Sequence, residues 1–126
     1  MTDRNQPGIK DFTDLLVYQK AYSQSLEIHR ATMEYPKHEQ YELGTQMRRA
    51  SKSICANLAE GFGKQNVSKP EFKRLLLIAM GSADEMRVWA RYSLDLGYID
   101  EGRWAAWDQS YRTIAQMLNG LHSKWG

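Results

Sequence analysis

The 126-residue sequence has one cysteine, three prolines and no long run of apolar residues. The single cysteine, Cys55, cannot form an internal disulfide, so nothing in the sequence indicates an oxidising compartment. No apolar run approaches the ~20 residues that span a bilayer, and the polar segment at residues 1–8 lacks the apolar stretch of a signal peptide. We therefore expect a cytoplasmic protein that has no membrane partner.

A large excess of one charge is also missing. Lys and Arg number 17 against 15 Asp and Glu, and the net charge of +2 is too small to indicate a nucleic-acid or membrane partner by itself. A composition of 42% apolar and 25% charged residues is ordinary for a globular protein. The length suits one domain, so we predict a polar N-terminal tail over residues 1–12 and a single domain over residues 13–126.

Apolar residues recur at three- and four-residue steps, which predicts four helices, over residues 14–33, 40–62, 68–97 and 100–125. Thr13 or Asp14 can cap the first helix, and Asp100 can cap the fourth. Ser68 and Glu71 form a capping box at the start of the third. Four such helices joined by short loops predict an all-α fold, an antiparallel up-down four-helix bundle.

The expected core is one apolar stripe on each helix. On the first helix the stripe is Leu15, Tyr18, Tyr22, Leu26, His29 and Met33. On the second helix it is Leu43, Met47, Ala50, Ile54, Leu58 and Gly61. On the third helix it is Phe72, Leu75, Leu76, Ala79, Ala83, Met86, Ala90 and Leu94. On the fourth helix it is a heptad seam: Trp104, Trp107, Tyr111, Ile114, Leu118, Leu121 and Trp125.

Two of the helices carry a second set of apolar or small residues opposite the core stripe. These residues are Cys55, Ala56 and Ala59 on the second helix and Leu77, Gly81, Val88 and Tyr92 on the third. Contiguous exposed apolar patches usually mark interfaces, so we predict a homo-oligomer that uses the outer faces of these two helices. The alternative is a scatter of surface apolar residues, which is common in monomers.

Motifs that carry chemistry are missing. The Glu-x-x-His pairs of di-iron bundles do not occur, and His29, His38 and His122 lie far apart in the sequence. There is no Gly-x-Ser-x-Gly elbow, and Cys55 lies between apolar residues as a buried, inert thiol would. We therefore expect no catalytic residues, no metal, no cofactor and no enzymatic activity.

A polar stripe runs beside the core stripe of the second helix and continues on the third. Its residues are Gln46, Arg49, Ser53, Asn57, Glu60, Ser82 and Glu85. We interpret it as a structural network in which Arg49 pairs with Glu85 and Asn57 with Glu60, because partly buried polar groups mostly satisfy one another. A polar pocket or a subunit contact is the alternative.

Charge is unevenly distributed along the chain. Residues 46–74 hold seven basic and two acidic side chains, a net charge of +5, whereas the remainder holds ten basic and thirteen acidic side chains, a net charge of −3. The candidate nucleic-acid-binding residues in this segment are Arg48, Lys52, Lys64, Lys69, Lys73 and Arg74. An oligomer would repeat such a patch, and affinity for phosphates grows with the number of contacts. A solvated charged surface is the alternative.

Two stretches resemble the signature of a known family: residues 39–50 (EQYELGTQMRRA) and residues 53–61 (SICANLAEG). The pairs and runs at residues 11–21, 71–72, 78–82 and 96–99, together with Glu85, also fit. They are similar to the four-helix bundle protein family, also called the 23S rRNA intervening-sequence protein family. Lys52 and Cys55 stand where that family usually has small or apolar residues and proline.

The resemblance implies a bundle that assembles as a pentamer, without enzymatic activity, in which Arg49, Asn57, Glu60 and Glu85 are structural. A related bundle is the accessory protein of diversity-generating retroelements, where a basic pentamer binds nucleic acid and a reverse transcriptase. Our leading hypothesis is a non-catalytic homo-oligomer, a pentamer, that binds RNA or DNA or acts as a scaffold. The alternative is a protein-interaction module whose partner is a reverse transcriptase, and a third, ligand binding in a central cavity, has only the polar stripe to support it.

Overall fold

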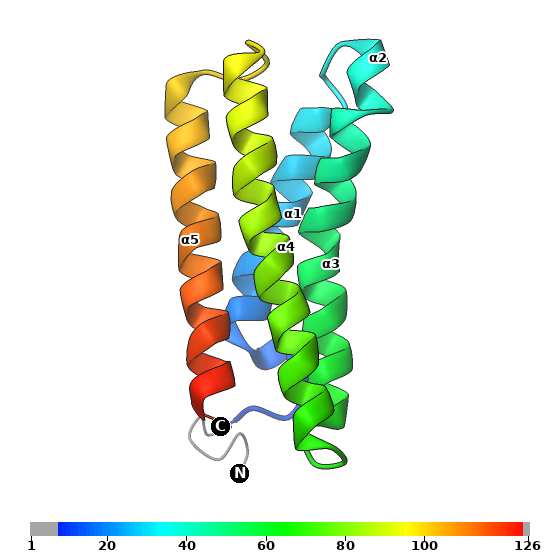
Figure 1. The fold of residues 1–126 in the computed structure, drawn as a ribbon, viewed down its shortest axis with the longest axis vertical. Coiled ribbons are helices and arrows are strands. Elements are labelled where there is room, and N and C mark those ends of the chain that lie inside the picture. Colours follow the sequence, from blue (N-terminus) through cyan, green and yellow to red (C-terminus); the bar gives the residue numbers. More distant parts are fainter. Residues whose placement is uncertain (1–7, 125–126) are drawn as a thin grey trace.

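The computed structural model describes residues 8–124, which form helices and no strand. Four long helices run antiparallel: α1 (Leu16–Thr32), α3 (Leu43–Lys64), α4 (Lys69–Asp95) and α5 (Glu101–Lys124) (Figure 1). A one-turn 3-10 helix, η1 (Phe12–Asp14), precedes α1, and the short α2 (Lys37–Gln40) lies between α1 and α3. The predicted up-down four-helix bundle is confirmed.

The helices form a square in cross-section. α3 packs on both α1 and α4, α4 packs on α5, and α5 packs more lightly on α1. Seen in Figure 1, α4 lies in front and α1 behind, with α5 and α3 on either side. α1 and α4 are therefore diagonal to each other.

The predicted boundary signals of α4 and α5 act largely as expected. The Ser68 hydroxyl oxygen accepts from the Glu71 amide at 3.3 Å, but the Glu71 carboxylate binds Arg74 instead of completing the capping box. Gly97, whose φ of +83° suits glycine, lies two residues past the end of α4 and terminates it with the two amide-to-carbonyl bonds of a Schellman motif. Asp100 Oδ1 accepts from the amide three residues later and caps α5.

The start of α1 differs from the prediction. Asp11, not Thr13 or Asp14, is the N-cap, and it caps η1: its carboxylate accepts from the Thr13 amide, while Asp14 Oδ2 accepts from the Asp11 amide at 3.0 Å. α1 then begins after Leu15 without a side-chain cap. Ile9 and Phe12 pack against the hydrophobic core, so the packed part of the chain includes residues before 13.

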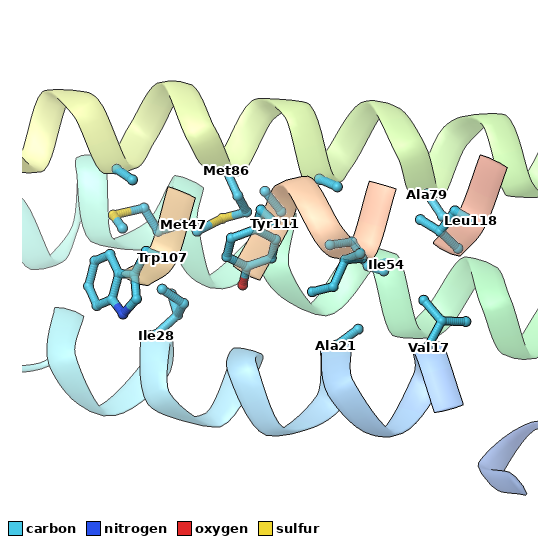
Figure 2. Packing of buried hydrophobic residues seen from close by; sticks show 14 of the residues in the cluster. Val17, Ala21, Ile28, Met47, Ile54, Ala79, Met86, Trp107, Tyr111 and Leu118 are labelled. Atoms are coloured by element: carbon cyan, nitrogen blue, oxygen red, sulfur yellow. The ribbon is translucent and has the colours of Figure 1, made fainter. Parts of the chain in front are cut away.

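The predicted core stripes of α3, α4 and α5 are confirmed within the described residues (Figure 2). All six α3 positions are buried. The α4 stripe is buried except for Leu94, which is half-buried. On α5 the buried positions are Trp107, Tyr111, Ile114 and Leu118, with Trp104 and Leu121 half-buried at the ends. Trp125 lies outside the described residues.

The predicted core stripe of α1 is wrong by about a quarter turn of the helix. The buried residues of α1 are Val17, Ala21, Ser25, Ile28 and Thr32. Of the predicted positions only Leu15 is buried; Tyr18, Leu26 and His29 are half-buried, and Tyr22 and Met33 are exposed. Small side chains at 21 and 25 leave room for the bulky core residues of α5, such as Tyr111 in Figure 2, so the smaller stripe faces inward.

Candidate functional site

The six candidate nucleic-acid-binding residues fall into two separate groups. Arg48 and Lys52 lie on the side of α3 that faces α1, where they contact Thr32 and His29. The other four lie around the turn between α3 and α4. Because an α-helix rises 1.5 Å per residue, Lys52 and Lys64 are ~18 Å apart along α3. The +5 segment is therefore not one continuous patch.

Arg48 is engaged within the chain. Its Nη1 donates to Thr32 Oγ1 at 2.9 Å and its Nη2 donates to the Gln40 carbonyl oxygen at 2.5 Å. Gly44 packs against this guanidinium, since a Cβ at position 44 would lie 2.9 Å from Nη1. Arg48 thus joins α1, α2 and α3, and its half-buried guanidinium has few donors left for a phosphate.

Lys52 is exposed and lies beside a histidine. Its Nζ is 3.0 Å from His29 Nδ1, a geometry in which a neutral imidazole accepts the bond. Burial, together with the nearby positive charges of Lys52 and Arg48, lowers the pKa of His29 below its ordinary 6.5. His29 is therefore neutral at pH 7, and this side of the bundle keeps the charge of the lysine.

The turn between α3 and α4 carries the exposed basic groups. Arg74 donates from Nε and Nη2 to the Glu71 carboxylate at 3.0 and 2.6 Å, which lowers the pKa of Glu71 and neutralises this part of the turn. Lys64 and Lys69 are exposed and Lys73 is half-buried; none of the three has an acidic partner among residues 8–124. These three lysines are the part of the predicted patch that forms no ion pair within residues 8–124.

The predicted interface residues also fall into two groups. Leu77, Gly81, Val88 and Tyr92 share the exposed outer face of α4, and the three large side chains among them are 51–54% exposed. Cys55 and Ala59 follow Lys52 at three- and four-residue steps, so they lie on the α1 side of α3, half-buried. Ala56 is exposed between the two sides. The structure does not bring the α3 and α4 residues into one surface.

Cys55 is only partly exposed to solvent. It packs against the hydrophobic core, and burial raises the pKa of its thiol to about 11. A thiol that stays protonated is a poor nucleophile and a poor metal ligand.

The polar network is smaller than predicted. Ser82 donates to Ser53 Oγ at 3.1 Å, and Asn57 Nδ2 donates to the Ser53 carbonyl and hydroxyl oxygens at 2.8 and 3.0 Å, so three residues join α3 to α4. The expected pair of Arg49 with Glu85 is not among the ion pairs of residues 8–124, because Glu85 accepts from Trp89 Nε1 at 2.9 Å instead.

The other expected pair, Asn57 with Glu60, is also replaced by the bonds to Ser53. Gln46, Arg49 and Glu60 are exposed on α3 and contribute nothing to this network. They remain accessible to a partner on the outer side of α3.

A groove between α4 and α5 is the feature that sequence reasoning missed. It encloses about 520 Å³, with Val88, Tyr92 and Trp104 among its lining residues. Asp108 lies at one side, where Arg87 donates to its Oδ1 at 2.8 Å and Arg112 to its Oδ2 at 2.9 Å. Arg87 and Asp108 are 21 residues apart on different helices, so no local pattern indicates their contact.

Two further absences hold for the described part of the chain. Among residues 8–124, no three His, Cys, Asp or Glu side chains lie close enough together to hold a metal ion. None of the helices in that range combines the length and apolar character needed to cross a membrane.

Comparisons with known proteins agree with the fold. No curated protein matches the chain. The chain is similar to a protein with unknown function from the S23 ribosomal protein family of Bacteroides thetaiotaomicron, whose crystal structure was determined at 1.70 Å resolution. The two are 21% identical, with a TM-score of 0.75 over 86% of this chain and 96% of that one, a likeness that concerns the fold. The family model of the 23S rRNA-intervening sequence proteins matches residues 13–120, so the chain belongs to that family.

Proposed function

We propose that the protein is a non-catalytic homo-oligomeric scaffold that binds nucleic acid through the turn between α3 and α4. The observation that carries the oligomer is the outer face of α4, where Leu77, Val88 and Tyr92 are each about half exposed in a single row. A monomer leaves this row in water, at a cost of roughly 25 cal/mol per Å² of apolar surface. A stoichiometry of five is what the family resemblance implies.

The nucleic-acid part of the proposal is supported by Lys64, Lys69 and Lys73. They lie at one end of the bundle, whereas the apolar faces run along its sides. An oligomer built through the sides leaves the ends open and brings several copies of the three lysines together. Phosphate contacts from several copies add up, so a patch that is weak in one subunit binds firmly in an oligomer.

Fluorescence anisotropy with a labelled RNA hairpin, and with single- and double-stranded DNA, tests this binding over a range of salt concentrations. We expect the dissociation constant to rise steeply with salt, with a log–log slope of about 0.7–0.9 per phosphate contact. The variant Lys64→Gln/Lys69→Gln weakens binding, and Arg30→Gln/Lys37→Gln, which removes the same charge from exposed positions toward the other end, leaves it nearly unchanged.

Two results would contradict the proposal. Equal weakening by both double variants would mean that the lysines act only through net charge, and binding that is absent at low salt would remove the nucleic-acid role. A protein-interaction role with a reverse transcriptase as partner would then be the better hypothesis, and a neighbouring reverse-transcriptase gene would favour it.

A further inference from the structure

A pocket walled by aromatic rings lies beside α2, where the start of α3 meets the end of α4. It encloses about 330 Å³, and Tyr41, Trp89 and Tyr92 are among its lining residues. α2 lies at the end of the bundle opposite the turn between α3 and α4 (Figure 1). The pocket and the three lysines of that turn are therefore at opposite ends of the molecule. We call this feature the α2–α4 pocket.

The aromatic walls of the pocket are held in place within the chain. Trp89 Nε1 donates to Glu85 Oε2 at 2.9 Å, and the indole also packs against the hydrophobic core. The centroids of the Trp89 and Tyr92 rings are 6.0 Å apart, with the ring planes tilted by 42°. Because its N–H is already bound, the indole offers a ligand its electron-rich π system and not a hydrogen-bond donor.

The α2–α4 pocket is negatively charged. The carboxylates of Glu39 and Glu42 line it, and within the described part of the chain its lining includes no lysine, arginine or histidine. Glu39 Oε2 accepts from the Tyr98 hydroxyl at 2.6 Å, which fixes that carboxylate. The exposed Glu42 carboxylate forms no hydrogen bond or ion pair within residues 8–124. Its full accepting capacity is therefore left for a cation.

The position of the pocket at the N-terminus of α3 does not reverse this charge. A helix N-terminus carries the equivalent of about +0.5 charge, whereas the two carboxylates carry −2 when both are ionised. Arg49 lies one turn along α3 from the lining residue Gln46 but does not itself line the pocket. The α4–α5 groove, by contrast, is lined by three arginines and three aspartates and has no such preference. The α2–α4 pocket is thus the one of the two that selects a cation.

The combination of aromatic rings with a free carboxylate suits a guanidinium better than other cations. A guanidinium is planar, stacks on aromatic faces and presents two parallel N–H groups to one carboxylate, as Glu42 offers. A lysine ammonium is a compact, strongly hydrated charge, and a quaternary ammonium has no N–H to donate. The Gln46 amide oxygen, also in the lining, can accept a further N–H.

The rim of the pocket indicates that the guanidinium belongs to a peptide. Tyr41 is 74% exposed and Leu96 is 52% exposed. A free small cation would leave both side chains in water, whereas the residues that flank an arginine in a peptide would cover them. A second copy of this chain is a poorer source, because most of its arginines are engaged. Those that already donate to oxygen atoms within the chain are Arg48, Arg74, Arg87, Arg91 and Arg112.

We propose that the α2–α4 pocket binds an arginine side chain from a basic segment of a partner protein. The guanidinium stacks on Trp89 and Tyr92 and donates to Glu42, while the flanking residues of the segment cover Tyr41 and Leu96. This site is separate from the proposed nucleic-acid binding at the other end of the bundle. One subunit can therefore hold a basic protein segment and a nucleic acid at the same time.

Three matched peptides test which cation the pocket recognises. The first is a fluorescein-labelled peptide of alternating arginine and glycine, and the other two carry lysine or citrulline in place of each arginine. Fluorescence anisotropy at low salt gives the dissociation constant of each. We expect the arginine peptide to bind severalfold more tightly than the lysine peptide. The citrulline peptide, which keeps the shape but lacks the charge, should not bind measurably.

Variants of the protein test where the arginine peptide binds. Glu42→Gln should weaken binding roughly 2- to 5-fold, as expected for an exposed ion pair, and Trp89→Leu roughly 2- to 30-fold through loss of the cation–π contact. Tyr41→Ala should also weaken it. The matched controls Glu34→Gln and Tyr22→Ala change an exposed carboxylate and an exposed ring outside the pocket, and should leave binding unchanged. Circular dichroism shows whether Trp89→Leu is folded; the other changes are at exposed positions.

Several outcomes would overturn the proposal. Absence of binding by the arginine peptide at low salt removes the site, and equal binding of the lysine peptide removes the preference for a guanidinium. Equal weakening by Glu34→Gln and Glu42→Gln means that only net charge acts. Argininamide that binds as tightly as the peptide rules out a peptide as the occupant. Loss of a wild-type oligomer in Glu42→Gln, measured by light scattering, would show that a second copy occupies the pocket.

Discussion

Replacing Tyr111 by Phe is expected to stabilise the bundle. The Tyr111 side chain is fully buried at its centre, and its hydroxyl has no hydrogen-bond partner among residues 8–124. Figure 2 shows the hydroxyl oxygen directed toward α1, between the levels of Ile28 and Ala21. Burial without a partner strongly raises the pKa of Tyr111, which keeps the hydroxyl protonated at any ordinary pH.

The magnitude follows from the cost of burying an unpaired hydroxyl. Protein data place that cost at roughly 1–3 kcal/mol. Tyr111→Phe keeps the ring, so the core loses only one oxygen atom and gains little cavity volume. We expect the free energy of unfolding to rise by about 1–2 kcal/mol and the melting temperature by roughly 3–8 °C.

Tyr35→Phe is the matched control. The Tyr35 side chain is also buried, but its hydroxyl donates to Ser93 Oγ at 2.8 Å. Tyr35→Phe loses this hydrogen bond, although Ser93 still donates to the Trp89 carbonyl oxygen, so the free energy of unfolding should fall by about 0.5–1.5 kcal/mol. The two variants delete the same atom from similar rings and should move stability in opposite directions.

Urea unfolding, followed by circular dichroism at one fixed protein concentration, measures both effects. The concentration must be fixed because assembly contributes to apparent stability. The slope of the free energy against urea should be the same for both variants, since neither changes the surface exposed on unfolding. If Tyr111→Phe destabilises the protein as much as Tyr35→Phe does, the hydroxyl has a buried partner and the reasoning fails.

Two further predictions concern an ion pair and a helix end. Burial raises the pKa of Asp108, but hydrogen bonds from Arg87 and Arg112 outweigh burial and hold the pKa below its usual 3.8. The ion pair therefore stabilises the fold above pH 3.8. This stabilisation is lost as the pH falls through the lowered pKa that Asp108 has in the folded protein. Solvent screens the more exposed Arg112, so Asp108→Asn should lower the free energy of unfolding in urea at pH 7 by about 1–2 kcal/mol. The difference in stability between variant and wild type should become smaller in acid, where Asp108 of the wild type is protonated. Gly97→Ala should lower the free energy of unfolding by about 1 kcal/mol, because the φ of Gly97 is +83°. Gly120→Ala should raise it by about 0.5–1 kcal/mol in the same assay, because Gly120 lies inside α5 and has open space around its Cβ position.

Local chemistry was enough to predict most of the fold. The α3 stripe from Leu43 to Gly61 has one apolar face, and the burial of all its six positions follows from helical spacing alone. Ser68, Gly97 and Asp100 mark helix ends because capping depends on residues within one turn. Signals of this range are readable in the sequence without knowledge of the partner helix.

The parts that failed depend on contacts between helices. Arg48 looked like a surface cation, yet its donors reach Thr32 of α1 and the Gln40 carbonyl oxygen, which only the folded connection brings near. Opposite charge predicted a pair between Glu85 and Arg49. In the structure the Glu85 carboxylate instead accepts a hydrogen bond from Trp89 Nε1, one turn away on the same helix. Charge alone does not choose among partners whose distances the sequence leaves open.

The core stripe of α1 was predicted wrongly because this helix has apolar residues on two faces. Its larger apolar stripe was assigned to the core by its three- and four-residue spacing, but Ala21 and Ser25 occupy the core and Tyr22 and Met33 face outward. A helix that closely approaches bulky neighbours needs small side chains on its inner face. On a helix with two apolar faces, the face with the larger side chains is therefore not necessarily the one that faces the core. Large apolar residues that remain half exposed need a different partner. Self-association in the proposed homo-oligomer would cover them, and light scattering at tens of micromolar decides between a second copy and solvent.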